Sequence, residues 1–211
     1  MRFPTSYGQL TVKQFLKVYD ILESNIDAFD KRMEIISYFL ECDANEIPFK
    51  QTGLKRFYKR NLSGYLAKAE KLINSPKPLK VRNTIYIGNK RYYTSLDAEA
   101  LNTNQYTAFA TYTQNGQGEK NLAKCLALLY YRHKFFTTPE FDSTKLKEIE
   151  ADIMNARLCD VYGTLVFFCK VVEQLNAIFP CYLMEVEMMI EKEIKQILTQ
   201  VSDSNTDGIT S

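Results

Sequence analysis

The sequence contains a single histidine, His133, and no tryptophan among its 211 residues. One histidine excludes zinc sites that need a histidine pair, such as H-E-x-x-H. The phosphate-binding loop G-x-x-x-x-G-K-[ST], the dinucleotide fingerprint G-x-G-x-x-G and the nucleophile elbow G-x-S-x-G are missing as well. We expect His133, at a predicted helix end, to complement the helix dipole rather than to catalyse a reaction. The sequence therefore predicts no catalytic residue, no metal site and no cofactor, and we expect a protein that is not an enzyme.

Long apolar stretches are also missing. The longest apolar run without a charged residue is Val161–Cys169, far below the roughly 20 residues that a membrane-spanning helix needs. Polar residues follow Met1–Pro4, so we expect no secretory signal peptide. The five cysteines are an odd number without a C-x-x-C pair, which is typical of reduced thiols packed as small apolar side chains. These features favour a cytosolic protein over a secreted one.

Charge is unevenly distributed along the chain, although the net charge is only +2. Eleven Lys or Arg and one acidic residue lie in Leu54–Arg91, whereas thirteen acidic and six basic residues lie in Glu140–Ser211. One interpretation is a pair of solvated faces of opposite sign that attract each other weakly. The other is a basic surface that docks an acidic partner or a phosphate backbone. The sequence leaves both interpretations open.

Apolar residues recur at helical spacing over most of the chain. Thr11 and Gln14 have the spacing of a capping box, in which each side chain bonds the backbone N–H of the other residue. The very apolar helix before Pro180 is expected to be the central core element. The predicted helices are Thr11–Ser24, Asp27–Cys42, Thr52–Ile73, Asn102–Gln114, Glu119–Arg132, Ser143–Ala156, Asp160–Phe179 and Cys181–Val201.

Two segments have the pattern of β-structure. Phe3–Gln9 is short and is predicted to be extended, as an edge strand. Ile85–Tyr93 alternates β-forming residues around Gly88-Asn89, which predicts a β-hairpin. We therefore predict a mainly α protein with a small β component, built as a helical domain with a central β-hairpin.

The two halves of the chain share a pattern. Leu10–Phe15 resembles Leu101–Tyr106, and a pair of predicted helices follows the start of each segment. Two explanations stay open: capped helices look alike, or a strand–helix–helix unit is duplicated. We predict an N-terminal helical unit over 1–78, a unit of hairpin and helices over 79–201 packed with it as one body, and a disordered tail over 202–211.

Two clusters of aromatic and basic residues are candidates for binding a partner. The first lies on a predicted helix, where Phe57 and Tyr58 are expected to face the protein core while the neighbouring bases reach outward. Interleaved rings and bases also suit nucleic acid. The second lies on the hairpin, where tyrosines suit a protein interface and strand edges can accept a strand of a partner. The predicted interaction surface comprises Lys55, Arg56, Lys59, Arg60, Tyr86, Arg91, Tyr92 and Tyr93.

Four short segments occur together in this chain: Leu10–Phe15, the hairpin Ile85–Tyr93, Leu101–Tyr106, and Asp160–Gly163 with the order D-V-Y-G. The combination resembles small virion-morphogenesis proteins of tailed bacteriophages, particularly of crAss-like phages. Some of these proteins are similar to tail assembly chaperones. The resemblance spans residues 3–180, and its motifs are structural rather than catalytic, so it implies no site residues.

The resemblance implies a protein that works in virion assembly without a cofactor, in the host cytoplasm and, as a virion component, in the particle. It would either keep a tail protein soluble until assembly, or enter the virion as a structural subunit or an ejected cargo protein. Phage tail or other virion proteins are the expected partners. The apolar stripe of Cys181–Val201 is expected to pack either on the protein's own core or against another copy of the chain. The alternative function is that of a nucleic-acid-binding accessory protein that uses the basic region 54–91.

Overall fold

The computed structural model of the protein describes most of the first 177 residues. The chain divides into two compact units, Met1–Cys169 and Lys170–Ser211. Residues on both sides of position 78 belong to the first unit, and the predicted division there stays a prediction. The predicted helix Cys181–Val201 and the predicted tail lie outside the described residues. The described residues are 3–42, 55–96, 103–114, 117–132 and 143–177, without the side chains of 55–61 and 143–144.

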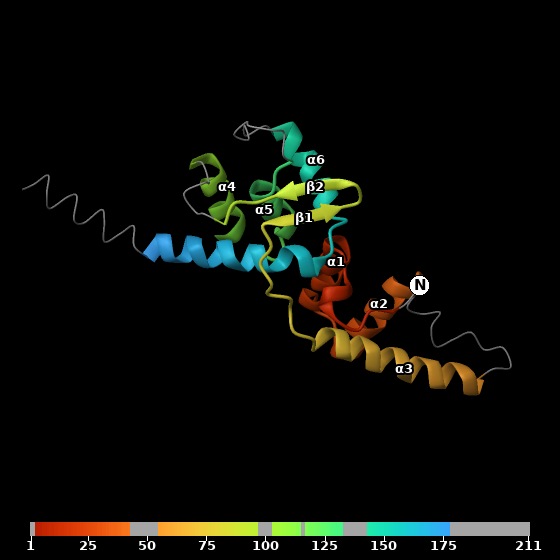
Figure 1. The fold of residues 1–211 in the computed structure, drawn as a ribbon. Coiled ribbons are helices and arrows are strands. Elements are labelled where there is room, and N and C mark those ends of the chain that lie inside the picture. Colours follow the sequence, from red (N-terminus) through yellow and green to blue (C-terminus); the bar gives the residue numbers. More distant parts are fainter. Residues whose placement is uncertain (1–2, 43–54, 97–102, 115–116, 133–142, 178–211) are drawn as a thin grey trace, which may run out of the picture. The chain divides into compact units, whose positions relative to one another are not determined.

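The described part of the chain is mainly helical and has one small antiparallel sheet, as the sequence predicts (Figure 1). A further helix, without a label in the figure, covers residues 158–177. The labelled helices are α1 (Val12–Glu23), α2 (Ala28–Leu40), α3 (Lys55–Ile73), α4 (Thr103–Thr113), α5 (Leu122–Leu129) and α6 (Ser143–Ile153). The sheet consists of β1 (Thr84–Ile87) and β2 (Lys90–Tyr93).

Local capping explains where the first two helices begin. The backbone N–H of Gln14 donates to the Thr11 hydroxyl at 3.2 Å, and the backbone N–H of Thr11 donates to the Gln14 side chain at 2.9 Å. This confirms the predicted capping box at the start of α1. Asp27 caps α2 in the same sense, because its carboxylate accepts from the backbone N–H groups of Phe29 and Asp30.

The predicted edge strand over Phe3–Gln9 is wrong. Tyr7–Gln9 form a turn of 3-10 helix instead. The side chain of Gln9 accepts a hydrogen bond from the backbone N–H of Thr5 at 2.7 Å, which closes the segment on itself rather than onto a neighbouring strand. The first copy of the hypothetical strand–helix–helix unit therefore lacks its strand, and the duplication stays a hypothesis.

The core of the first unit surrounds α5. Every residue of this helix except Lys124 is buried, and α5 packs against α1, α4 and α6. The helix after α6 contributes a second fully buried segment at residues 161–165, which fits its predicted role in the core. On α1 the buried side chains are Val12, Phe15, Val18 and Ile21, three residues apart, so that one stripe faces the interior.

A pair of backbone contacts joins the beginning of the first unit to its end. The backbone N–H of Val12 donates to the carbonyl of Ala156 at 3.0 Å, and that of Leu158 donates to the carbonyl of Leu10 at 2.8 Å. These bonds form an isolated antiparallel bridge between Thr11 and Arg157. The chain before α1 is therefore held against the chain after α6.

The helix α5 ends earlier than predicted. The sequence pattern predicts a helix up to Arg132, but Tyr130 is already extended. Tyr131 then exchanges two backbone hydrogen bonds of 2.9 Å with Tyr93 of β2. These bonds replace the intrahelical ones that Tyr131 would make, so the hairpin gains a short third partner along β2.

The hairpin turns as the sequence predicts. Gly88 has a φ of 57°, whereas Asn89 has no positive φ, which fits a type II′ turn with glycine at its first central position. Thr84 pairs with Tyr93, Tyr86 with Arg91, and the remaining pairs are Ile85 with Tyr92 and Ile87 with Lys90. Since side chains alternate between the two faces of a sheet, Ile85, Ile87, Lys90 and Tyr92 share the inner face, and Thr84, Tyr86, Arg91 and Tyr93 share the outer face.

Candidate interaction surface on the hairpin

The outer face of the hairpin presents an arginine between two tyrosines. The guanidinium carbon of Arg91 lies 4.5 Å from the ring centroid of Tyr93 and 5.7 Å from that of Tyr86. Both distances fit cation–π contacts. The Tyr86 side chain is 66% exposed, and Arg91 is exposed as well. The two rings limit the conformations of the arginine, so this face offers a partner an ordered group rather than a mobile side chain.

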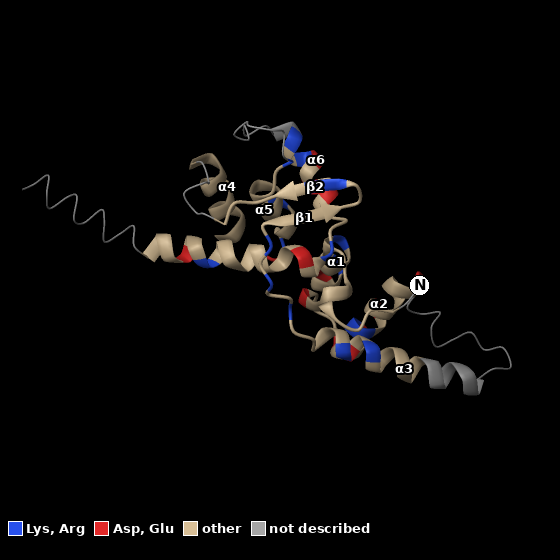
Figure 2. Ribbon diagram, viewed as in Figure 1, with Lys and Arg blue, Asp and Glu red and all other residues tan. Residues whose placement is uncertain are grey.

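Arg91 is available for an anion because its charge is not matched within the described residues. Its neighbours are matched: Lys90 lies 2.5 Å from a carboxylate oxygen of Asp152, and Arg82 lies 3.2 Å from one of Asp160. No described carboxylate forms an ion pair with Arg91. Lys and Arg occupy the start of β2 (Figure 2). A planar guanidinium without an ion-pair partner can bind a carboxylate or a phosphate with two parallel hydrogen bonds.

The sequence predicts Tyr92 as part of the interaction surface, but the structure does not place it there. Its side chain is fully buried, and its hydroxyl donates a hydrogen bond to the carboxylate of Asp152 on α6. Burial, followed by the hydrogen bond to Asp152, raises the pKa of Tyr92 well above its usual value. The alternation of side chains around Gly88 contained the signal for this, since it places Tyr92 on the same face as Ile85.

Tyr93 contributes only part of its side chain to the surface. It is half-buried, and its backbone N–H and carbonyl are both occupied by Tyr131. Its ring still stacks on Arg91. Of the four hairpin residues predicted for the surface, the structure therefore brings Tyr86, Arg91 and Tyr93 together on one face and removes Tyr92.

The basic cluster is placed only by its backbone. Lys55, Arg56, Lys59 and Arg60 lie in the first part of α3, and their spacing puts them on one side of the helix. Their side chains lie outside the described residues, as do those of Phe57 and Tyr58. The prediction that these aromatic residues face the core stays a prediction, and His133 also lies outside the described residues.

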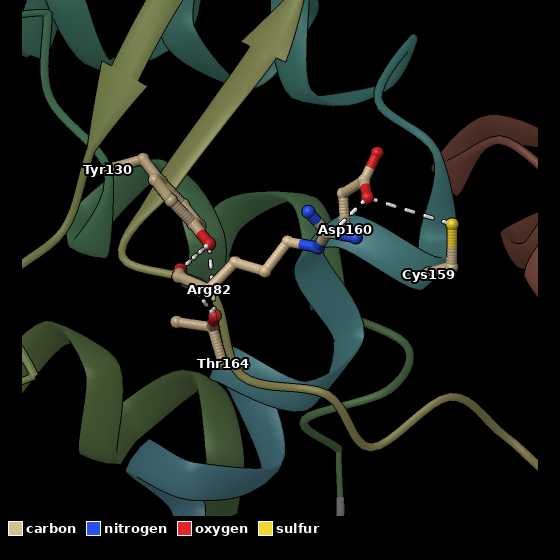
Figure 3. A network of polar contacts seen from close by, with 5 residues as sticks. All are labelled: Arg82, Tyr130, Cys159, Asp160 and Thr164. Atoms are coloured by element: carbon tan, nitrogen blue, oxygen red, sulfur yellow. Dashed lines mark hydrogen bonds and ion pairs between the residues drawn. The ribbon is translucent and has the colours of Figure 1, made fainter.

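A polar network ties the segment before β1 to the end of α5 and to the helix after α6 (Figure 3). The hydroxyl of Tyr130 donates to the backbone carbonyl of Arg82 at 2.9 Å and lies 3.0 Å from the hydroxyl of Thr164. The guanidinium of Arg82 pairs with Asp160, which also accepts from the thiol of Cys159 at 3.8 Å. Burial raises the pKa of Tyr130 to about 12. We interpret this network as structural, because each of its members bonds another member.

A second network involves Lys77, which lies earlier in the same segment. Both carboxylate oxygens of Glu119 accept from Lys77, at 2.6 and 2.7 Å, and one of them also accepts from the hydroxyl of Tyr162. The ammonium of Lys77 lies 5.9 Å from the ring centroid of Phe15 and 5.8 Å from that of Tyr162. Burial, followed by Glu119, raises the pKa of Tyr162. The carboxylate is neutralised by its own lysine, which is the arrangement of a structural ion pair.

Sequence reasoning did not find either network. Their members lie far apart in the chain, as with Lys77 and Glu119, and no spacing rule relates them. In the described part of the chain, no group of three or more His, Cys, Asp or Glu side chains is arranged to hold a metal ion. None of the helices described here is both long and apolar enough to cross a membrane. The chain matches no protein-family model, no curated protein and no solved structure.

Proposed function

We propose that the chain is a non-enzymatic protein of a tailed bacteriophage that acts in virion assembly through contacts with other proteins. The observation that supports binding is the outer face of the hairpin. Tyr86 and Leu79 are the most exposed large hydrophobic side chains among the described residues, and Tyr86 lies beside Arg91, whose charge is unmatched there. Tyrosine and arginine are enriched among the residues that dominate binding energy at interfaces. The assignment to a phage comes from the sequence resemblance.

Two roles fit this proposal, and both place the protein in the host cytoplasm during assembly. As a tail assembly chaperone it would hold a tail protein soluble and leave before the particle matures. As a virion protein it would remain in the particle, either as a structural subunit or as cargo. In each role the hairpin face contributes a rigid aromatic contact, because a tyrosine loses little conformational freedom when a partner covers it.

Mass spectrometry of gradient-purified particles separates these roles. A reproducible copy number of the chain in the particles is the expected result for a virion component. Recovery of the chain only from infected-cell lysate, in complex with a tail protein, is the expected result for a chaperone. Recovery in neither place, from cells that express the chain from its native genome, would refute an assembly role.

A pair of matched variants tests whether the hairpin face carries the contact. Tyr86→Ser removes the exposed ring from β1, and Phe29→Ser removes a ring that is 53% exposed at the start of α2. Both side chains are largely solvent-exposed, so we expect both variants to fold. We expect Tyr86→Ser to weaken capture of the partner at least about fivefold and Phe29→Ser to leave it unchanged. Equal capture by the two variants would remove the hairpin from the proposal.

A nucleic-acid-binding function is the second candidate, and one feature of α3 favours it. The described part of α3, Lys55–Ile73, contains six Lys or Arg and one acidic residue, Glu70. A helix with this excess of basic residues suits a phosphate backbone. The test is binding to single- and double-stranded DNA at increasing salt, where phosphate contacts predict a steep loss of affinity. Unmeasurable binding at low salt would exclude this function.

A further inference from the structure

The outer edge of β1 has unused backbone hydrogen-bonding groups. Tyr93 directs its N–H and carbonyl away from β1, to Tyr131. In an antiparallel pair the residue opposite such a position also directs its backbone groups outward, and the pattern repeats every second residue. Thr84 is opposite Tyr93, and Tyr86 is two residues further along β1. The N–H and carbonyl groups of Thr84 and Tyr86 therefore point to the outer edge of β1.

These groups have no partner among the described residues. No hydrogen bond from the described part of the chain reaches the outward backbone groups of Thr84 or Tyr86. Arg82 lies two residues before Thr84, and its carbonyl, in contrast, accepts hydrogen bonds from the hydroxyls of Tyr130 and Thr164. The two edges of the hairpin thus differ, because Tyr131 closes part of β2 while β1 keeps two residues that can pair with a further strand.

The basic charge around the hairpin favours a partner strand that carries acidic residues. The sequence from Leu79 to Leu96 contains four basic residues and no acidic one. Within the hairpin Lys90 is paired with Asp152, which leaves Arg91 as the base on the outer face without a described carboxylate. A strand beside β1 that carried Lys or Arg would meet like charge, whereas one that carried Glu or Asp would supply the missing carboxylate.

We propose that the outer edge of β1 binds an extended, acidic segment of a partner protein, which pairs with Thr84 and Tyr86 and places a carboxylate on Arg91. The inference rests on the proposed function and specifies its mode of recognition. Strands in a sheet are about 4.8 Å apart, so a residue beside Tyr86 lies roughly 10 Å from the backbone of Arg91. The guanidinium leans over the ring of Tyr86, and a glutamate of the partner spans the remaining distance.

A peptide fits this edge better than a nucleic acid does. The edge offers alternating donors and acceptors, since each outward residue contributes one N–H and one carbonyl. The backbone of a peptide strand matches both kinds of group. A phosphate backbone satisfies Arg91 and the N–H groups but leaves the carbonyls of Thr84 and Tyr86 without donors.

The test uses the full chain and a fluorescently labelled peptide of alternating Glu and Val, with binding measured by fluorescence anisotropy. Arg91→Gln removes the charge from the outer face, and we expect it to weaken binding about tenfold or more. Lys17→Gln is the matched control, because it removes an exposed base from α1, and we expect no change. Thr84→Pro removes one outward N–H, at a position where an edge strand tolerates proline, and we expect a comparable loss.

A second peptide keeps the proposal testable even if the proline variant fails to fold. The same peptide with every backbone amide methylated retains its carboxylates but cannot donate to the edge, and we expect its binding to the unaltered chain to be lost. Equal binding of the two peptides would overturn strand addition, as would binding of single-stranded DNA in place of the peptide. The two tests can also disagree: the Tyr86→Ser variant can lose capture of the partner while the unaltered chain binds no peptide. That result would refute strand addition and leave the proposed function standing.

Discussion

Among the described glycines, Gly163 is the one at which an added methyl group is expected to matter most. It lies in the helix over 158–177, where the segment before β1 crosses it. A Cβ atom at this position would lie 2.4 Å from the carbonyl oxygen of Lys80 and 2.6 Å from that of Leu79. These are backbone atoms, so the whole segment must move to admit an alanine.

The expected cost follows from opposing effects. Replacing a helical glycine with alanine normally stabilises a protein by up to about 1 kcal/mol. Overpacking typically costs about 1–3 kcal/mol. The displaced segment also carries the carbonyl of Arg82, and each weakened hydrogen bond there costs about 0.5–1.5 kcal/mol. We expect Gly163→Ala to lower the free energy of unfolding by about 1–3 kcal/mol.

Gly64→Ala is the matched control for this experiment. Gly64 lies in α3, and a Cβ there would have nothing within 4 Å. We expect this substitution to raise the free energy of unfolding by about 0.4–1 kcal/mol. The assay is urea denaturation followed by circular dichroism, comparing the midpoints of both variants with that of the unaltered chain. If Gly163→Ala stabilised the protein as Gly64→Ala does, the close approach of the segment to this helix would be refuted.

Three further substitutions test contacts that hold the first unit together, each read from the urea midpoint. Thr11→Ala removes the cap of α1, and we expect a loss of about 1 kcal/mol; an unchanged midpoint would contradict the capping box. Tyr130→Phe removes one hydroxyl, and we expect a loss of only about 1 kcal/mol, because Thr164 still donates to the carbonyl of Arg82. Burial disfavours ionisation of Asp152, but the hydrogen bonds from Lys90 and Tyr92 outweigh it and lower the pKa of this carboxyl. The folded protein therefore binds the proton of Asp152 less readily than the unfolded chain does. The free energy of unfolding that results is fully present above the pKa of an unfolded Asp, about 3.9, and is lost as the pH falls through the lower pKa of the folded state. Asp152→Asn should make the midpoint less dependent on pH below about 4, and an unchanged dependence would show that other carboxyls cause it.

The elements that could be predicted from the sequence are those governed by short-range chemistry. The capping box of Thr11 and Gln14 involves residues three apart, and it starts α1 as expected. The turn at Gly88 depends on the freedom of one glycine to adopt a positive φ, and it places the hairpin correctly. In both cases the deciding hydrogen bonds or torsion angles lie within a few residues, where a pattern in the sequence records them.

The candidate site was predictable only in part. Its position on the hairpin followed from the β-forming residues, but treating all the tyrosines there as surface residues was wrong for Tyr92. The hydroxyl of the buried Tyr92 donates to Asp152, which lies on α6 and has no sequence relation to the hairpin. The proposed binding edge of β1 likewise depends on the pairing of Tyr131 with Tyr93. This pairing requires α5 to end earlier than its apolar pattern predicts.

The sequence by itself determined which of the described segments become α-helices, where the hairpin turns, and that the chain lacks the phosphate-binding loop, the dinucleotide fingerprint and the nucleophile elbow. Only the tertiary structure decided that Tyr131 pairs with β2, which bases keep an unmatched charge, and why residue 163 must lack a side chain. The physical reason is the range of the interactions. Caps, turns and helical periodicity are satisfied between near neighbours, whereas burial and ion pairing depend on which distant segments fold against each other.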